Sequence, residues 1–439
     1  MSGLDERRLG WVEDASEHIS AARLREIVSD LVDIPSPTGS EGPLAEHIAH
    51  VLRHSGVTAV AQPLDDRQAN AWGRIHGSGS GPDLMLYAPI DTFSTGDPAQ
   101  DLPAIGREWR SYMLPHAEVI DDLVTGLGAS NPKGHVACVM AAAEAISAAG
   151  IPLTGDLVVA LGAGGMPTNS LPGSVRRNTG QGVGCSFLLE QGVWTDFALI
   201  AKPGWSVSWE EVGLAWFEVT VYGTHTYVGS RHRLPYRNAI ADAGQVIERL
   251  ERWFVDYALR HTDGLVAPQG IVSSIDGGWP RMAAAATGSC RFHIDLRLSP
   301  RTTPMQAKRE FRAAIAAICD ELPDVELNWE MILAIPGPGT DPASWICRSA
   351  IAAWERIEGR PHEPVLGNSG ATDANILRSR GIPTARVGMP KVAVAPFPID
   401  FTAGMNTVDV NEMGRLTRHL IEVAIDTLTR TRAEVGLST

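Results

Sequence analysis

Residues Leu84–Asp91 read LMLYAPID, a short apolar run that ends in a polar turn. An alanine-rich segment, Gly134–Ala149, follows and predicts a helix that stops at Gly150. Two more short apolar runs come later, at Leu157–Leu161 and Phe197–Ala201. Buried strands that alternate with helices of this length predict an α/β fold, with a mostly parallel sheet flanked by helices. In such sheets the ligand site lies beyond the carboxyl ends of the strands.

The pattern changes at about residue 213 and predicts a second domain. Strands that alternate polar and apolar residues are combined there with two amphipathic helices, which is typical of a ferredoxin-like α+β unit. We therefore expect an α/β domain formed by residues 1–212 and 331–439, with residues 213–330 inserted into it. The predicted elements of the insert are Leu214–Tyr222, Asn238–Tyr257, Cys290–Leu298, Pro304–Cys319 and Val325–Trp329.

Composition limits the classes of partner. The chain has 439 residues, enough for two hydrophobic cores, and a net charge of −14. This charge argues against nucleic acid or an anionic membrane as a partner. No apolar run approaches the length of about 20 residues that a membrane span needs. The N-terminal residues do not read as a secretory signal, and the five cysteines are scattered. We expect a cytoplasmic protein with reduced thiols.

Five segments, taken together, resemble the metal-binding motifs of a known family. They occur in the order and at roughly the spacing found in the aminoacylase, acetylornithine deacetylase, succinyl-diaminopimelate desuccinylase and carboxypeptidase G family of dinuclear zinc peptidases and amidohydrolases. Two segments without metal ligands, HIDLRLSP at His293–Pro300 and GNSGATDANILRSRGIP at Gly367–Pro383, are also close to the wording of this family. The five motif segments are LMLYAPID, GLGASNPKG (Gly126–Gly134), LVVALGAGG (Leu157–Gly165), DFALIAKP (Asp196–Pro203) and FTAGMNTVDV (Phe401–Val410).

The resemblance implies a zinc-exopeptidase-like domain, and a lid domain at residues 213–330 through which the protein forms a homodimer. Each of the five metal-binding positions, however, lacks its usual ligand. Zinc is bound in proteins by His, Asp, Glu or Cys. The family positions are held here by Pro89, Asn131, the Gly164–Gly165 pair, Lys202 and Phe401, with Met405 or Asn406 as alternatives for the last. We therefore predict a divergent member with no metal and no other cofactor.

Lys202 is the most informative of these changes, because it replaces a carboxylate that faces the metal in the family. Its ammonium group could polarise a carbonyl or hold a substrate carboxylate, and a buried lysine could also act as a base or a Schiff-base nucleophile. Asp91 survives from the first motif as a possible general acid or base, or as the partner of Lys202. Both residues could instead have structural roles. Lys202 and Asp91 could pair and close the pocket, and Asp91 could cap a turn.

Further residues are predicted from the resemblance to contact a substrate. Tyr227 and His225 lie where the family places a histidine that stabilises the oxyanion from the partner subunit, followed by a basic stretch that begins at Arg231. His135 is expected at the surface, and Arg297 could equally pair with Asp295. The predicted substrate-binding residues are Asn131, Lys133, Asn238, Arg297, Asn368, Ser369 and Gly370.

Three functions are compatible with these residues. The favoured one is a metal-independent amidohydrolase or peptidase-like enzyme that acts on a C–N bond of a small anionic substrate, such as an N-acyl amino acid. The alternative is a non-catalytic protein that binds a small carboxylate or a peptide-like ligand. The third is a metalloenzyme with ligands elsewhere, such as His116, Asp121 and Asp122, which read as a surface loop.

Overall fold

The fold was analysed in a computed structural model, which describes residues 4–106, 108–171, 173–392 and 401–438. The chain forms two compact units. The first comprises Met1–Trp209, Thr340–Pro364 and Thr372–Thr439, and the second comprises Glu210–Gly339 and Val365–Ala371. The second unit thus begins and ends close to the predicted insert, and it also takes in a short segment from much later in the chain.

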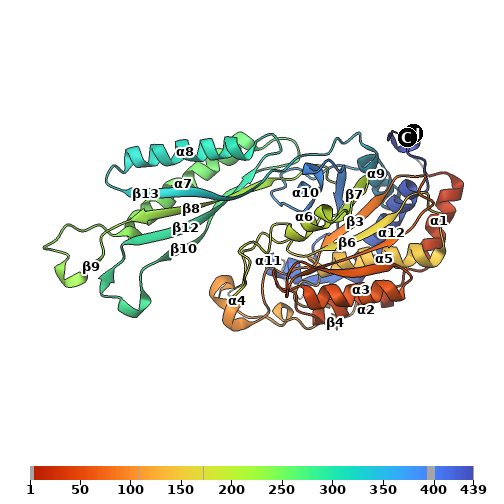
Figure 1. The fold of residues 1–439 in the computed structure, drawn as a ribbon, viewed down its shortest axis with the longest axis horizontal. Coiled ribbons are helices and arrows are strands. Elements are labelled where there is room, and N and C mark those ends of the chain that lie inside the picture. Colours follow the sequence, from red (N-terminus) through yellow and green to blue (C-terminus); the bar gives the residue numbers. More distant parts are fainter. Residues whose placement is uncertain (1–3, 107, 172, 393–400, 439) are drawn as a thin grey trace. The chain divides into compact units, whose positions relative to one another are not determined.

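A six-stranded mixed sheet forms the centre of the first unit (Figure 1). Neighbouring strands β6, β3, β7 and β14 are parallel, whereas β1 and β2 join the sheet by antiparallel pairing. The predicted parallel α/β sheet is therefore confirmed for four strands, and a hairpin extends it. In sheet order the strands are β1 (Thr58–Pro63), β2 (Ala69–Ile75), β6 (Leu157–Gly162), β3 (Leu84–Pro89), β7 (Phe197–Ala201) and β14 (Thr384–Val387).

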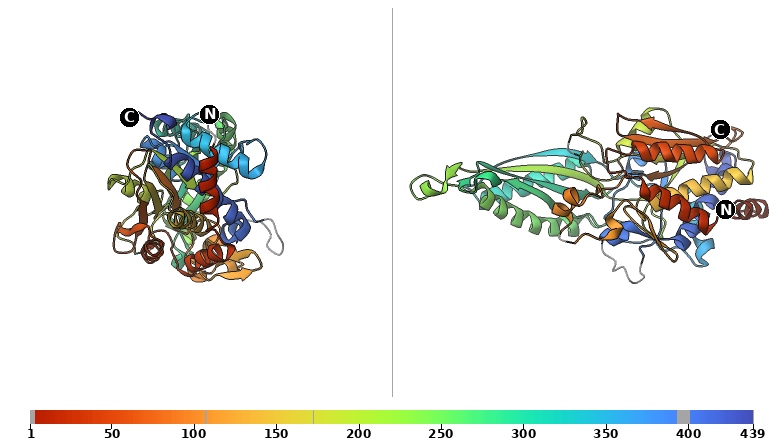
Figure 2. Two further views of the ribbon diagram at one scale, coloured as in Figure 1. Left: turned by 90° about the vertical axis from the view of Figure 1, so that its right-hand side faces the viewer. Right: turned by 90° about the horizontal axis from the view of Figure 1, so that it is seen from below.

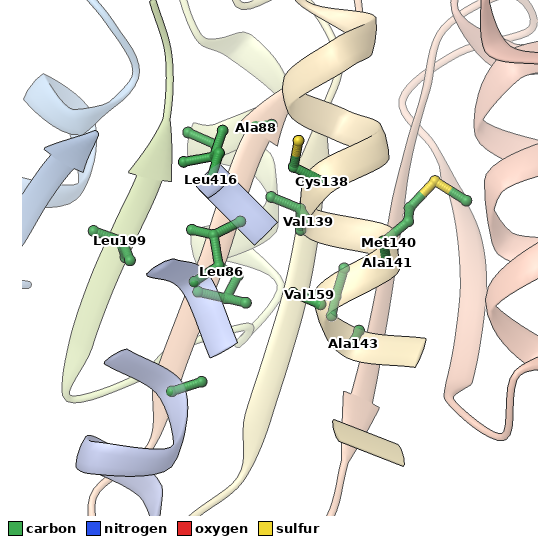
Figure 3. Close-up of a cluster of buried hydrophobic side chains, with 14 of the residues drawn as sticks. Leu86, Ala88, Cys138, Val139, Met140, Ala141, Ala143, Val159, Leu199 and Leu416 are labelled. Atoms are coloured by element: carbon green, nitrogen blue, oxygen red, sulfur yellow. The ribbon is translucent and has the colours of Figure 1, made fainter. Parts of the chain in front are cut away.

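Helices cover both faces of this sheet because its strands are apolar on both sides. Leu84, Leu86 and Ala88 pack in the core cluster with helices α5 and α12, while Met85 and Tyr87 pack in the cluster with α6 and α10. Figure 3 shows Leu86 and Ala88 close to the α5 side chains. The helices of this unit are α1 (Glu6–Ser16), α2 (Ala21–Asp33), α3 (Gly42–His54), α4 (Pro98–Ile105), α5 (Lys133–Ala149), α6 (Val183–Glu190), α9 (Trp345–Glu358), α10 (Ala374–Ser379), α11 (Phe401–Asn406) and α12 (Val410–Leu428).

Helix α5 is the central helix of the unit. Most of its side chains are buried, as expected for a helix that is apolar on all sides. It ends at Gly150, which adopts the left-handed conformation that favours glycine. A small antiparallel sheet near its start is made of β15 (Thr407–Asp409), β5 (Leu123–Thr125) and β4 (Glu118–Ile120). This sheet brings the late segment 401–409 beside the residues that precede α5.

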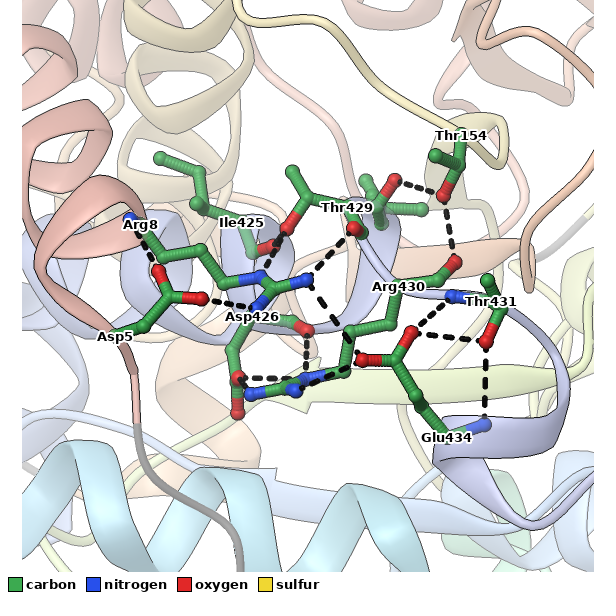
Figure 4. Close-up of polar contacts among 10 residues, drawn as sticks. Asp5, Arg8, Thr154, Ile425, Asp426, Thr429, Arg430, Thr431 and Glu434 are labelled. Atoms are coloured by element: carbon green, nitrogen blue, oxygen red, sulfur yellow. Dashed lines mark hydrogen bonds and ion pairs between the residues drawn. The ribbon is translucent and has the colours of Figure 1, made fainter.

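Polar contacts connect the first helix to the last turn of α12 (Figure 4). The Arg8 guanidinium donates to the hydroxyl of Thr429 at 2.9 Å and to its carbonyl at 3.0 Å. Arg430 forms a buried ion pair with Asp426, 2.6 Å between Nη2 and Oδ1. These contacts anchor α1 to α12, which packs against the central helix.

The second unit is a four-stranded antiparallel sheet with two helices on one face. Along the chain its elements follow the order strand, helix, strand, strand, helix, strand, which is the ferredoxin-like arrangement predicted from the sequence. Figure 2 shows the helices running along the sheet. In sheet order the strands are β10 (Gly270–Gly277), β12 (Ser289–Leu298), β8 (Gly213–Tyr222) and β13 (Glu326–Ile335), with helices α7 (Ala239–His261) and α8 (Pro304–Glu321).

A two-stranded extension, β9 (Thr226–Tyr227) with β11 (Ala285–Ala286), belongs to the same unit. The late segment 365–371 joins the second unit through backbone hydrogen bonds. The Asn368 amide donates to the Leu265 carbonyl, and the Asn368 carbonyl accepts from the Ala267 amide, both at 3.0 Å. Among the described helices, none is long and apolar enough to cross a membrane.

The core of the first unit predicts a large effect of truncation. Leu86 is fully buried on β3, so replacing it with alanine should lower the free energy of unfolding by about 2–5 kcal/mol. Leu259, which is 76% exposed on α7, is a suitable control and should cost little when changed to alanine. Chemical denaturation measures both, and equal losses would contradict this account of the core.

Candidate functional site

The carboxyl ends of the parallel strands bring three of the five motif segments together, and the segments around Asn131 and Met405 join them through other contacts. Pro89 at the end of β3 pairs with Gly162 at the end of β6, and Val387 of β14 pairs with Ala201 of β7. Lys202 follows β7 directly. The segment before α5 is brought to the same place by side-chain contacts. The site is thus formed at the sheet edge where ligands bind in α/β proteins.

Lys202 lies inside this site, with 5% of its surface exposed. Its Nζ donates to Oδ1 of Asn131 at 3.2 Å. Asn131 is fixed in turn by Met405, which accepts from its backbone amide at 3.0 Å and contacts its Nδ2 through sulfur at 3.2 Å. Gly388 packs on Lys202 so closely that a Cβ atom there would lie 1.7 Å from the Lys202 carbonyl oxygen. The lysine therefore occupies a tightly enclosed position.

Asp91 is fully buried and accepts three hydrogen bonds. The donors are the Thr38 hydroxyl at 2.7 Å and the backbone amides of Gly165 and Met166 at 2.7 and 2.9 Å. Burial raises the pKa of this carboxyl, while the hydrogen bonds and the charge of Lys202 act in the opposite direction. Lys202 thus interacts electrostatically with Asp91, and the carboxylate is held in place by the protein around it.

A second buried carboxyl, Glu41, lies beside Asp91 and was not predicted from the sequence. It accepts from the backbone amides of Gly39 at 3.0 Å and Gly164 at 2.9 Å, and from the Gln68 side chain at 3.1 Å. Burial and the neighbouring charge of Asp91 raise the pKa of Glu41 to about 8. Its position just before a Gly-Pro helix start resembles an ordinary exposed acid, so the sequence carries no clear signal for its burial.

The loop Gly164–Met166 holds both carboxyls by its successive backbone amides. The amide of Gly164 points to Glu41, and those of Gly165 and Met166 point to Asp91. Gly164 has a φ of +63°, and a Cβ there would lie 2.1 Å from the Thr179 carbonyl oxygen. This backbone therefore requires glycine. At a position where the resembled family has acidic side chains, this chain offers N–H donors.

Tyr87 and Asp373 form another pair that the sequence did not reveal. The fully buried Tyr87 hydroxyl donates to Oδ2 of Asp373 at 2.6 Å. Burial raises the pKa of Tyr87, and the nearby Asp373 carboxylate adds to the increase. A Cβ on Gly165 would lie 2.8 Å from Oδ2 of Asp373 and 2.3 Å from Cβ of Pro89, so this pair lies directly beside the glycine loop.

His135 was expected at the surface, and this expectation is wrong. It is fully buried in the first turn of α5, because the whole start of this helix is enclosed. Its Nδ1 lies 2.8 Å from the Ser130 carbonyl, and its Nε2 accepts from the Met389 amide at 3.4 Å. Burial and the charge of Lys202 lower the pKa of His135 to about 3. The ring is therefore neutral and satisfied by the backbone.

Lys133 has a structural contact in the same region. Its fully buried Nζ donates to the carbonyls of Ile34 at 2.8 Å and Val32 at 3.4 Å, at the end of α2. Burial lowers the pKa of Lys133 to about 7. These contacts aim the amine at the end of a helix, where carbonyls lack partners within the helix. Its predicted role in substrate binding is not needed to explain its position.

The other predicted substrate contacts lie in the second unit. Asn238 caps α7 by accepting from the amide of Ile240 at 3.0 Å, and Arg297 forms an ion pair with Asp295 at 2.7 Å. Both therefore have structural roles, and the alternative considered for Arg297 agrees with its observed contact.

The two predicted lid residues are accessible. His225 contacts the Ala286 carbonyl through Nδ1 at 2.8 Å, and Tyr227 is 56% exposed on β9. Asn368, Ser369 and Gly370 lie in the same unit, where the Ser369 hydroxyl donates to the Ala267 carbonyl. Of the predicted residues, Lys202, Asp91, Asn131 and Lys133 belong to the first unit and the remaining seven to the second.

The donor set does not fit a dinuclear zinc site. In the described parts of the chain, no group of three or more His, Cys, Asp or Glu side chains could hold a metal ion. The residues considered as alternative metal ligands make ion pairs at the surface instead. His116 lies 3.4 Å from Asp33, and Asp122 lies 3.5 Å from Arg25. The Phe401 side chain lies outside the described residues. Among the described residues, the polar groups at the inherited positions bind one another.

Comparison with known proteins agrees with this architecture. The chain is 24% identical over 374 residues to succinyl-diaminopimelate desuccinylase of Bradyrhizobium diazoefficiens, covering 80% of this chain and 88% of that enzyme. No protein-family model matches the chain. Among solved structures, it is similar to human carnosine dipeptidase 1, with a TM-score of 0.71, 12% identity, and coverage of 98% of this chain and 100% of the other.

The chain is therefore similar in sequence to one amidohydrolase and shares the fold of the M20 peptidases. The fold is shared with further members of this family. The dipeptidase Dug1p of Saccharomyces cerevisiae has a TM-score of 0.72 at 12% identity, covering 95% of this chain and 99% of its own. The M20 metallo-carboxypeptidase of Sulfolobus solfataricus has a TM-score of 0.64 at 14% identity, with coverage of 97% and 100%. This chain thus has the same fold as these proteins.

The buried Glu41 predicts a specific pH dependence of stability. In the native protein the Glu41 carboxyl keeps its proton up to about pH 8, whereas in the unfolded chain the same carboxyl loses its proton at about pH 4.3. Between these values the native state binds more protons, so this group makes the free energy of unfolding fall as the pH rises, by at most about 1.4 kcal/mol per pH unit.

The Glu41→Gln variant should lose this contribution, and denaturation across pH 5–8 measures it as the difference from the unmodified protein. Glu46→Gln, an exposed change on the same helix, is the control and should leave the profile unaltered. Parallel profiles for Glu41→Gln and the unmodified protein would reject the assignment.

Gly164 predicts a steric cost that can be separated from backbone strain. Gly150 has nearly the same φ, +61°, but nothing lies within 4 Å of a Cβ placed there. Gly150→Ala should therefore cost about 1–2 kcal/mol from strain alone. Gly164→Ala should cost a further amount of about 1–3 kcal/mol because the Thr179 carbonyl must move. Equal losses in thermal or chemical denaturation would show that the loop yields freely.

Proposed function

We propose that this protein hydrolyses an amide C–N bond of a small anionic molecule, such as an N-acyl amino acid, without a dinuclear zinc centre. The observation that carries the proposal is Lys202, a buried ammonium group at the end of β7, in the position of a family carboxylate. The similarity in sequence to an amidohydrolase and in fold to the M20 peptidases supports the reaction type, and the donor set supports metal independence.

Amide hydrolysis needs a positive group where the carbonyl oxygen becomes negative. Fixed donors in an enclosed site supply this stabilisation without reorganising in the transition state. The Lys202 amine donates to Asn131 at 3.2 Å, and the charge of Lys202 lowers the pKa of Asp91. In the proposed reaction, the oxygen of water bonds to the carbonyl carbon while Lys202 stabilises the developing oxyanion. The C–N bond then breaks, and both protons of the water end on the departing nitrogen, which gives a carboxylate and an ammonium product.

A binding function is the second candidate, and a separate observation favours it. Asp91 and Glu41 already accept hydrogen bonds from the protein's own amides, so neither carboxyl is free in the closed arrangement to take a proton from water. In this case the same site would retain a small carboxylate or peptide-like ligand without turnover.

The Lys202→Met variant tests the catalytic proposal. Purified, EDTA-treated protein should hydrolyse a member of an N-acetyl amino acid and dipeptide panel, and Lys202→Met should lose turnover by about 100-fold or more. Lys308→Met, a partly exposed change on α8, is the control and should retain activity. Circular dichroism checks that both variants fold.

Each outcome of this experiment has a consequence. Turnover that requires added zinc, or zinc bound near stoichiometric amounts by elemental analysis, would overturn metal independence. Unchanged turnover in Lys202→Met would remove this residue from the mechanism. A ligand that raises the melting temperature without being hydrolysed would establish the binding function.

Several predictions accompany this proposal. Tyr227 and His225 are proposed as hydrogen-bond donors to a substrate oxygen, consistent with their accessible position on and beside β9. Homodimer formation through the second unit and a cytoplasmic location also remain predictions.

A further inference from the structure

Lysine is rare in this chain and concentrated around one site. Only four of the 37 lysine and arginine residues are lysines: Lys133, Lys202, Lys308 and Lys391. Arginine therefore serves nearly everywhere that a positive charge is needed. A lysine differs from arginine by its compact, strongly hydrated ammonium group on a flexible stem. Lys133 and Lys202 lie in the candidate site, which directs attention to the environment of Lys391.

Lys391 follows β14 by a short segment that covers Lys202. Gly388 packs on the Lys202 carbonyl and on the His135 ring, as a Cβ there would lie 2.9 Å from Nε2 of the histidine. The carbonyl of Met389 accepts from the Gly204 amide at 2.8 Å. The chain therefore runs beside the backbone of Lys202 and the ring of His135 before it reaches Lys391.

The side chain of Lys391 lies along helix α11. A Cβ on Gly404 would be 3.2 Å from Cδ of Lys391 and 3.5 Å from its Cε. The next residue, Met405, holds Asn131 through both backbone and side chain, and Asn131 binds Lys202. Helix α11 thus contacts both lysines, one of them indirectly. Gly404 packs against the side chain of Lys391, and Met405 holds Asn131, the partner of Lys202.

The two amines differ in access. Lys202 is enclosed, whereas Lys391 is exposed and forms no ion pair with any residue that the structure describes. Many arginines of the chain pair with a carboxylate, as Arg415 does with Glu412 at 2.7 Å. Within the described ranges, the exposed Lys391 amine close to the site thus has no carboxylate partner, which suits it to bind an anion from solution.

We propose that Lys391 binds the anionic group of the substrate at the entrance of the site, while Lys202 acts on the reacting carbonyl. This inference rests on the proposed function, since it assigns the recognition of the anion at the same site. An ammonium on a flexible stem can follow ligands of different length, which suits N-acyl amino acids whose carboxylate lies a few bonds from the amide.

Competitive labelling of the lysines tests this proposal without measuring turnover. The unmodified protein is treated with a trace of acetic anhydride, and the acetylation of Lys391 and Lys308 is measured by mass spectrometry of its peptides. Lys308 serves as an internal reference in the same sample. A set of N-acetyl amino acids are the probes, and their uncharged amides, such as N-acetylglycinamide for N-acetylglycine, are the matched controls.

We expect at least one anionic probe to slow the acetylation of Lys391 several-fold, with Lys308 unchanged and the uncharged amide without effect. Lys391→Met should weaken binding of that probe about ten-fold or more, and Lys391→Arg should restore part of it. Equal rates at Lys391 with and without every probe, or equal slowing at both lysines, would overturn the proposal.

The outcome is distinguishable from a failure of the proposed function. Protection of Lys391 without hydrolysis supports the anion site and rejects the catalytic proposal. Hydrolysis without protection rejects the role of Lys391 alone. If Lys391 acts only in binding, its replacement by methionine should raise KM and leave kcat nearly unchanged.

Discussion

Two buried carboxyl groups depend on three successive backbone amides, and the local structure of the site follows from that contact. Glu41 and Asp91 come from distant parts of the chain and would repel each other in an apolar interior if both were ionised. The amides of residues 164–166 compensate this repulsion and fix the ends of β3 and β6. Lys202 adds a positive charge close to Asp91. The two buried carboxyl groups are therefore stabilised by hydrogen bonds within the protein and by one ammonium group.

This balance explains how an M20 scaffold can persist with different site chemistry. In a metal site, clustered carboxylates are stabilised by the cations that they bind. Here the remaining acids are stabilised by protein groups, and the tyrosine–aspartate pair Tyr87–Asp373 and the neutral His135 complete the enclosure. The folded state thus has ways of accommodating these polar groups that need no ion. Stabilisation of these polar groups by the protein itself is compatible either with catalysis by the Lys202 ammonium group or with ligand binding alone.

The sequence predicted the architecture well because it depends on patterns of long range. Short apolar runs alternating with helices gave the α/β class, and the motif order gave the family. The neighbouring positions of Lys202 and Asp91 follow from the rule that parallel strands end at one edge, whereas Asn131 contacts Lys202 from the loop before α5. Glu41 could not be predicted in the same way, because its burial results from a loop more than a hundred residues away. His135 was misjudged because the start of α5 is enclosed by the segments that follow β5 and β14.

The glycine loop also limits how the site can be changed. A side chain at Gly164 would meet the Thr179 carbonyl, and one at Gly165 would meet Pro89. An acid introduced at either position would therefore require neighbouring atoms to shift. Engineering carboxylate ligands into this loop calls for coordinated changes at several residues, because each single substitution is opposed by the packing around it.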